Sequence, residues 1–282
     1  MSASPPLLLL GLSGQIGTAL DTTALPLPAL ALSRQPPPAR AGVRWQQGDL
    51  GGFQAEAGFE AVLSFGPLDA LAEAAVAGRL RAQRIVAFGS TSRWAKAESP
   101  DPAERALALR LAAAEAALGE VQRRAGGRLT LLRPTLVWGA GRDATLSRVA
   151  HWARRWPLLP LPLGAPGERQ PVHVADLAAL ALRTLALGAE AEGGFDLPGG
   201  ETLPLGVALR RTVAAAAPGC RLLRLPWRPL AALGRQRGHG ALARLGEDLV
   251  FDARPAQAAL GWRPRGFQPA PADFAALALP RA

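Results

Sequence analysis

The sequence contains few of the residues that form cross-links or bind metals. Its 282 residues include one cysteine, three histidines and no tyrosine. The single cysteine, Cys220, cannot form a disulfide within the chain and has no second thiol with which to hold a metal. This content suits a reducing compartment, and we predict no metal site.

Long hydrophobic runs are also missing. Hydrophobic residues make up 49% of the chain, but no uninterrupted run approaches the roughly 20 residues that cross a bilayer. The first ten residues lack a basic start, and their apolar stretch is too short for a secretory signal. We therefore expect a cytoplasmic protein with no membrane partner.

Negative charge is scarce, because 32 basic residues face 22 acidic ones and give a formal net charge of +10. A basic balance can indicate binding to nucleic acid. However, Lys96 is the only lysine, and the arginines are scattered among alanines without a dense basic run. This distribution favours a solvated basic surface over a nucleic-acid patch. Attraction for phosphorylated small molecules remains compatible with it.

Short apolar segments alternate with longer alanine-rich ones. The short segments predict strands at 7–10, 30–32, 43–47, 61–65, 84–88 and 129–137. The longer segments predict helices at 69–81 and 103–124. This alternation predicts an α/β fold, a Rossmann-type doubly wound parallel sheet. The apolar stripes of the two helices could serve a homodimer or, equally, the core of the monomer.

Proline- and tryptophan-rich stretches at 152–167 and 222–240 indicate a second, smaller lobe for a substrate. We expect the dinucleotide-binding core to span residues 1–150. Segments 170–190 and about 248–254 are expected to return to that core. Residues 151–169 and 191–282 would then form most of the substrate lobe.

The first strand leads directly into a glycine-rich turn. Gly11, Gly14 and Gly17 are spaced as GxxGxxG, with Ser13, Gln15 and Ile16 between them. In such a turn the first glycine permits the tight bend, the second lets the backbone approach a pyrophosphate, and the third lets a helix pack on the strand. We therefore predict a dinucleotide site here, with a helix starting after the turn. Backbone amides at that helix start would receive the phosphates.

The end of the second strand bears on the choice of cofactor. NAD-binding proteins commonly place a carboxylate there, whereas this chain has Ser33 and Arg34. A guanidinium is a permanently charged fork for phosphate oxygens. We therefore expect NADP(H) in preference to NAD(H). The alternative is that Arg34 is a solvated arginine at a strand end.

Five further motifs occur in the order typical of one family. They are Gly48-Asp49-Leu50, Phe65-Gly66-Pro67, Leu132-Arg133-Pro134 through Trp138-Gly139, Gly167 through Leu177, and Asp252-Ala253-Arg254 followed by Leu260-Gly261-Trp262. With the glycine turn, they make the chain similar to the extended and atypical short-chain dehydrogenases/reductases, the NAD-dependent epimerase/dehydratase group.

The resemblance implies roles for several residues. Cofactor contacts are implied for Asp49, Leu50, Phe65, Gly66, Pro67, Ser90 and Pro134. Substrate contacts are implied for Trp138, Arg142, Arg169 and His173, with Arg169 on the diphosphate of a nucleotide-linked substrate.

The catalytic residues of that family are largely missing. The family uses a Ser or Thr after the fifth strand, with a Tyr and a Lys four residues apart on the next helix. Thr91 stands at the hydroxyl position, but Leu107 and Leu111 stand where the Tyr and Lys belong. Because the chain has no tyrosine, no other alignment restores the pair.

Thr91 and His173 are the remaining catalytic candidates. His173 could instead have a structural role, and Lys96 is expected to be a solvated loop residue. Two functions stay open. One is an atypical reductase or nucleotide-sugar epimerase/dehydratase-like enzyme whose proton comes from water, Thr91 or His173. The other is a non-catalytic NADP(H)-binding sensor or regulator.

Overall fold

The computed structural model describes residues 7–35 and 39–275. Its centre is a parallel sheet with strand order β11-β6-β5-β4-β1-β2-β3. The strands are β1 (Leu7–Leu10), β2 (Ala29–Ser33), β3 (Val43–Gln47), β4 (Phe59–Ser64), β5 (Ala82–Phe88), β6 (Arg128–Pro134) and β11 (Gly193–Leu197). This confirms the predicted α/β fold class.

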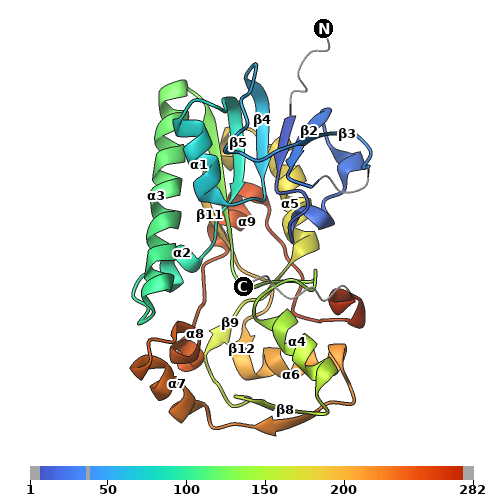
Figure 1. Cartoon of the computed structure of the whole chain (residues 1–282), viewed down its shortest axis with the longest axis vertical. Helices are drawn as coiled ribbons and strands as arrows, with labels where there is room; N and C mark the ends of the chain where they lie inside the picture. Colours follow the sequence, from blue (N-terminus) through green and yellow to red (C-terminus); the bar gives the residue numbers. More distant parts are fainter. Residues whose placement is uncertain (1–6, 36–38, 276–282) are drawn as a thin grey trace.

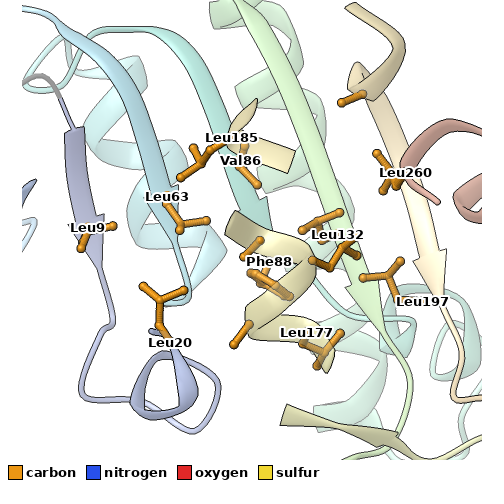
Figure 2. Packing of buried hydrophobic residues seen from close by; sticks show 14 of the residues in the cluster. Leu9, Leu20, Leu63, Val86, Phe88, Leu132, Leu177, Leu185, Leu197 and Leu260 are labelled. Carbon is orange, nitrogen blue, oxygen red and sulfur yellow. The ribbon is translucent and has the colours of Figure 1, made fainter. Parts of the chain in front are cut away.

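The sheet is held by apolar side chains on both of its faces. All four residues of β1 are buried, and they alternate between two separate core clusters. Figure 2 shows Leu9, Leu63 and Leu132 on the face that also receives Leu177 and Leu185. Each fully buried leucine contributes roughly 1.5–3 kcal/mol of hydrophobic stabilisation. The continuous apolar run of β1 therefore fixes it at the centre of the sheet.

Helices cover each face (Figure 1). One face carries α1 (Leu68–Val76) and α3 (Pro102–Ala125), which contact each other. The other carries α5 (Val174–Ala186) and α9 (Arg254–Leu260). Both predicted helices are present. The first ends earlier than expected, because Gly78 turns the chain with a φ of 69° before β5 begins.

The helix predicted after the glycine turn is absent, so that prediction is wrong. Only two single turns follow, η1 (Gly17–Ala19) and η2 (Thr22–Ala24). The side chain of Asp21 accepts a hydrogen bond from the Thr23 amide, which competes with helical bonding. Pro26 and Pro28 then force an extended approach to β2. The segment thus crosses the sheet without a phosphate-binding helix.

The smaller lobe surrounds a third apolar cluster. Its elements are α4 (Leu146–Arg155), β8 (Leu158–Leu161), α6 (Leu205–Ala216), β13 (Arg221–Arg224), α7 (Trp227–Gln236), α8 (Gly240–Ala243), η4 (Arg244–Gly246) and η5 (Pro271–Phe274). Two short strand pairs lie between the lobes, β7 (Val137–Trp138) with β10 (Val172–His173) and β9 (Glu168–Arg169) with β12 (Leu203–Pro204). Figure 1 shows this lobe below the carboxyl ends of the strands.

The lobe boundaries differ from the expected ones at three places. α4 begins at Leu146 and packs in the small lobe, although the core was expected to extend to residue 150. β11 was assigned to the substrate lobe, yet it pairs with β6 in the main sheet. α9 packs against β11, and Trp262 joins the same cluster, so the returning segment is longer than 248–254.

The close packing at Gly11 gives a stability prediction. Gly11 has a φ of 71°, and a Cβ there would lie 2.6 Å from the amide nitrogen of Gly66. We expect Gly11→Ala to lower the free energy of unfolding by about 3 kcal/mol in urea denaturation. Gly126→Ala is the matched control, because its φ is 64° but nothing lies within 4 Å of its Cβ position. A loss of about 1 kcal/mol is expected for the control, and equal losses would contradict this account.

Candidate functional site

The glycine turn lies where the order of the strands reverses. β1 is bonded to β2 on one side and to β4 on the other, and crevices for ligands form at such positions. The Phe65 amide donates to the Leu10 carbonyl at 2.8 Å, which holds the loop after β4 against the turn. Phe65, Gly66 and Pro67 therefore lie beside the glycine turn, in agreement with their expected position.

The turn closes on its own backbone. The Gly14 amide donates to the Gly11 carbonyl at 2.8 Å, and a Cβ on Gly17 would lie 2.5 Å from that same oxygen. The third glycine, Gly17, thus allows close backbone contact within the turn and does not pack a helix on the strand. The amides of Ser13, Gln15 and Ile16 donate to no other residue in the described part of the chain. They are available to oxygen atoms of a ligand.

Three side chains hold the turn in place. The Arg142 guanidinium donates to the Ser13 carbonyl at 2.7 Å, and Gln15 Nε2 donates to the Val137 carbonyl at 3.4 Å. Arg40 donates to the Gly17 carbonyl at 3.1 Å and also to that of Leu20. Arg142, expected at a substrate, is therefore placed at the glycine turn. Arg40 escaped sequence reasoning, because no motif marks it.

Of the residues expected near the adenosine half of a cofactor, some have free side chains and others are already hydrogen-bonded within the described part of the chain. Arg34 is exposed, and its side chain forms no ion pair within the described residues. The Ser33 hydroxyl donates to the Gln35 carbonyl at 2.9 Å. Asp49 Oδ1 accepts from the amides of Gly51 and Gly52, so that oxygen stabilises its own loop. Leu50 packs against the core.

The hydroxyl residues after β5 are tied to neighbouring backbone. Thr91 is buried, and its hydroxyl donates to the Pro134 carbonyl at 3.2 Å. Its proton is therefore held by the end of β6. The Ser90 hydroxyl accepts from the Ser92 amide at 3.1 Å.

α3 is the helix on which the similar family carries its Tyr and Lys, and in this chain its side chains pack in the core and form ion pairs. Leu111 packs into the core under the sheet, and Leu107 is half-buried. Four residues further on, Glu115 is buried and accepts hydrogen bonds from Arg93 and Arg133. Burial disfavours the charge of Arg133, but the hydrogen bonds and charge of Glu115 outweigh it and raise the Arg133 pKa. This pair joins α3 to β6.

Lys96, the only lysine, pairs with Glu104 at 3.1 Å. Glu104 also accepts from Ser99 at 2.6 Å and from both terminal nitrogens of Arg244, at 2.5 and 2.8 Å. The Arg244 hydrogen bonds are the main reason that the Glu104 pKa falls to about 2. Because Arg244 belongs to η4, this cluster links α3 to the small lobe. The expectation of a solvated Lys96 is therefore wrong.

His173 is held on both sides of its ring. Its Nδ1 accepts a hydrogen bond from the Ala175 amide at 3.1 Å, so His173 caps the start of α5. Because Nδ1 accepts a hydrogen bond, Nε2 carries a ring proton and donates it to Asp273 Oδ1, 3.2 Å away. Trp138, fully buried, packs edge-on against the ring at 4.5 Å. These contacts give His173 and Trp138 structural roles.

Arg169 is committed to the protein backbone. Its Nη1 donates to the carbonyls of Glu168 and Glu247, and its Nη2 donates to the carbonyl of Arg244 at 2.8 Å. Burial, aided by the neighbouring Arg244 charge, lowers the Arg169 pKa to about 10. The guanidinium thus holds the backbone at residues 244 and 247, whereas a contact with a diphosphate was expected. The sequence does not reveal the contacts with Arg244 and Glu247, because these residues lie 75 and 78 positions further along the chain.

The fold is shared with solved structures, although no family profile and no curated protein matches the chain. MoeE5 in complex with UDP-glucose and NAD has a TM-score of 0.67 at 19% identity, over 95% of this chain and 96% of that one. A UDP-galactose 4-epimerase has a TM-score of 0.70 at 15% identity, over 96% and 97% of the two chains. TunA, an NAD-dependent NDP-hexosamine 5,6-dehydratase, has 0.65 at 16% identity, over 97% and 96%. The chain thus has the fold of NAD-dependent nucleotide-sugar epimerases and dehydratases.

The Glu104 cluster predicts a pH dependence of stability. The folded-state pKa of about 2 lies below the ordinary 4.5, so the ion pairs stabilise the fold fully above pH 4.5 and progressively less as the pH falls towards 2. We expect Glu104→Gln to cost about 2 kcal/mol at pH 7 and much less near pH 2.5.

Urea denaturation of both proteins across this pH range measures the difference. Glu120→Gln, which removes a carboxylate from exposed ion pairs on the same helix, is the control and should change little. A Glu104→Gln cost that stayed constant with pH would contradict the assignment.

Proposed function

We propose that this chain binds NADP(H) at the glycine turn and acts as a sensor or regulator of cofactor state without epimerase or dehydratase chemistry. The observation that carries the proposal is a difference between the backbone of the glycine turn and the candidate catalytic side chains. Backbone amides of the turn are free for a ligand, whereas the side chains expected to move protons are tied to the protein.

The turn suits a pyrophosphate in its backbone and in its charge. A Cβ at Gly14 would lie 2.9 Å from the Gly11 carbonyl oxygen, so glycine keeps the turn tight. Without a long helix at this point, little macrodipole is available to attract an anion. The exposed guanidinium of Arg142 supplies positive charge instead, because it lies 2.7 Å from the Ser13 carbonyl. NAD in the MoeE5 complex supports the choice of ligand class.

The preference for NADP(H) rests on Arg34. Its guanidinium is exposed at the carboxyl end of β2, which is next to β1 in the sheet. Ser33 and Arg34 replace the acidic side chain that favours an unphosphorylated ribose. An arginine fork matches the oxygens of a 2′-phosphate.

Catalysis is disfavoured by the chemistry of the remaining groups. Bound NADP(H) would supply hydride, but a carbonyl that accepts hydride also needs a proton donor. Loss of one positioned acid or base typically costs 10²- to 10⁴-fold in rate. Leu107 and Leu111 carry no titratable proton, and Thr91 and His173 direct theirs to Pro134 and Asp273. An atypical reductase or epimerase with water as the donor is the alternative.

Binding of the two cofactors tests the role of Arg34. We expect NADPH to bind at least about tenfold more tightly than NADH, measured by quenching of tryptophan fluorescence. Arg34→Ala should abolish the preference by weakening NADPH alone. Arg44→Ala, a change at another exposed arginine on the neighbouring strand β3, is the control. Equal affinities in the unmodified protein, or a preference that survives Arg34→Ala, would contradict the proposal.

Turnover tests the absence of catalysis. With cofactor bound, we expect no change in reduced-nicotinamide absorbance across a panel of nucleotide sugars and carbonyl compounds, and no epimerised or dehydrated sugar by chromatography. The double variant Leu107→Tyr with Leu111→Lys asks whether the dyad alone is missing. Turnover by the unmodified protein above the uncatalysed rate would favour the enzyme alternative.

A further inference from the structure

The positive charge of the chain is concentrated in the small lobe. Segments 144–167 and 202–246 contain 11 arginines and not one aspartate or glutamate. The chain has 32 basic and 22 acidic residues, so 21 basic and all 22 acidic residues lie outside these segments. The rest of the chain is therefore nearly neutral. The arginines are scattered along the sequence, but the fold gathers these two segments into α4, β8, α6, β13, α7 and α8.

Few carboxylates from other parts of the chain pair with these arginines. Glu104 pairs with Arg244, and Glu201 pairs with Arg211. The other nine arginines of the two segments form no ion pair with any residue that the structure describes. In most of the large lobe, by contrast, acidic and basic residues are interspersed. These two segments of the small lobe thus present largely uncompensated positive charge.

Large apolar side chains are exposed in the same lobe. Trp152 lies in the last turn of α4 and Trp156 is the residue that caps the end of this helix; they are 41% and 54% exposed. Arg148 and Arg155 share that face of the helix by their spacing, and the Arg155 guanidinium lies 5.1 Å from the Trp156 ring centre.

Further apolar side chains are exposed on the two-stranded ribbon that follows α4 in the chain. Leu158, two residues after Trp156, is 52% exposed in β8 and lies in register with Arg221 of β13. Pro160 lies in register with Leu223, which is 50% exposed. In a parallel pair, residues in register point to the same face. We call Trp152, Trp156, Leu158, Pro160 and Leu223, with the nearby Arg148, Arg155 and Arg221, the tryptophan–arginine surface.

We propose that the tryptophan–arginine surface binds an anionic membrane. Indole rings sit at the headgroup level of a bilayer, leucines enter the acyl boundary, and arginines pair with lipid phosphates. Leu158, Pro160 and Leu223 offer neither stacking nor base-directed hydrogen bonds, so the composition favours lipid over nucleic acid. In the described residues no helix is long and apolar enough to span a membrane. Binding is therefore through this surface, which revises the expectation of no membrane partner.

The position of the surface leaves the candidate cofactor site free. β8 and β13 lie at the end of the small lobe that faces away from the main sheet (Figure 1). Docking through this end would hold the glycine turn away from the lipid. Cofactor binding and membrane binding can therefore be measured independently on the same protein.

Co-sedimentation with vesicles tests the proposal. The full chain should bind vesicles of phosphatidylcholine with phosphatidylglycerol and not vesicles of phosphatidylcholine alone, with weaker binding as salt rises. Each of Arg148→Gln, Arg155→Gln and Arg221→Gln should weaken binding roughly fivefold. Trp152→Ser with Trp156→Ser should weaken it at least about tenfold and should remove quenching of tryptophan fluorescence by brominated lipids.

The matched control is Leu109→Ser with Arg110→Gln, which removes an exposed leucine and an exposed arginine from α3 in the large lobe. Circular dichroism and NADPH titration report whether each variant is folded. Equal binding to both vesicle types, or losses in the control as large as those in the variants, would overturn the proposal. Tighter binding to an oligonucleotide than to anionic vesicles at the same salt would also overturn it, in favour of nucleic acid.

Discussion

The contact between the backbones of Gly11 and Gly66 determines the rest of the candidate site. The two residues follow the adjacent parallel strands β1 and β4, and they come so close that no side chain fits at Gly11. Within the turn, the amides of Ser13, Gln15 and Ile16 donate to no other described residue. The contact between Gly11 and Gly66 also fixes the crevice at the point where the order of the strands reverses, where a dinucleotide is proposed to bind.

Around that crevice, the charged side chains stabilise the structure. Glu115 holds Arg93 and Arg133 together, and Glu104 ties Lys96 on the large lobe to Arg244 on the small one. Both of these carboxylates are paired with arginines, which offsets the cost of desolvating their charge.

The sequence predicted the elements whose pattern is local. β1 and β3 have the expected bounds, and α3 lies within one residue of its prediction, because Asp101 caps its start and Gly126 ends it. The helix expected from the glycine motif is not formed, because Asp21 caps a new short turn and two prolines follow it.

Side-chain roles that depend on distant segments could not be obtained from the sequence. Arg169 bonds to carbonyls 75 and 78 residues away, and His173 faces Asp273, 100 residues away. The gathering of arginines in the small lobe has the same origin, since segments 144–167 and 202–246 meet only in the fold. The family motifs drew attention to Arg169 and His173 but did not reveal which groups these side chains contact.

Hydrogen exchange of the glycine turn tests the central claim most directly. Mass spectrometry of peptides covering residues 11–20, with and without NADPH, reports on the amides of Ser13, Gln15 and Ile16. We predict that saturating NADPH slows exchange of these amides, while peptides from α7 in the small lobe are unchanged. Exchange of the turn that NADPH leaves unaltered, at concentrations where binding is saturated, would contradict the account.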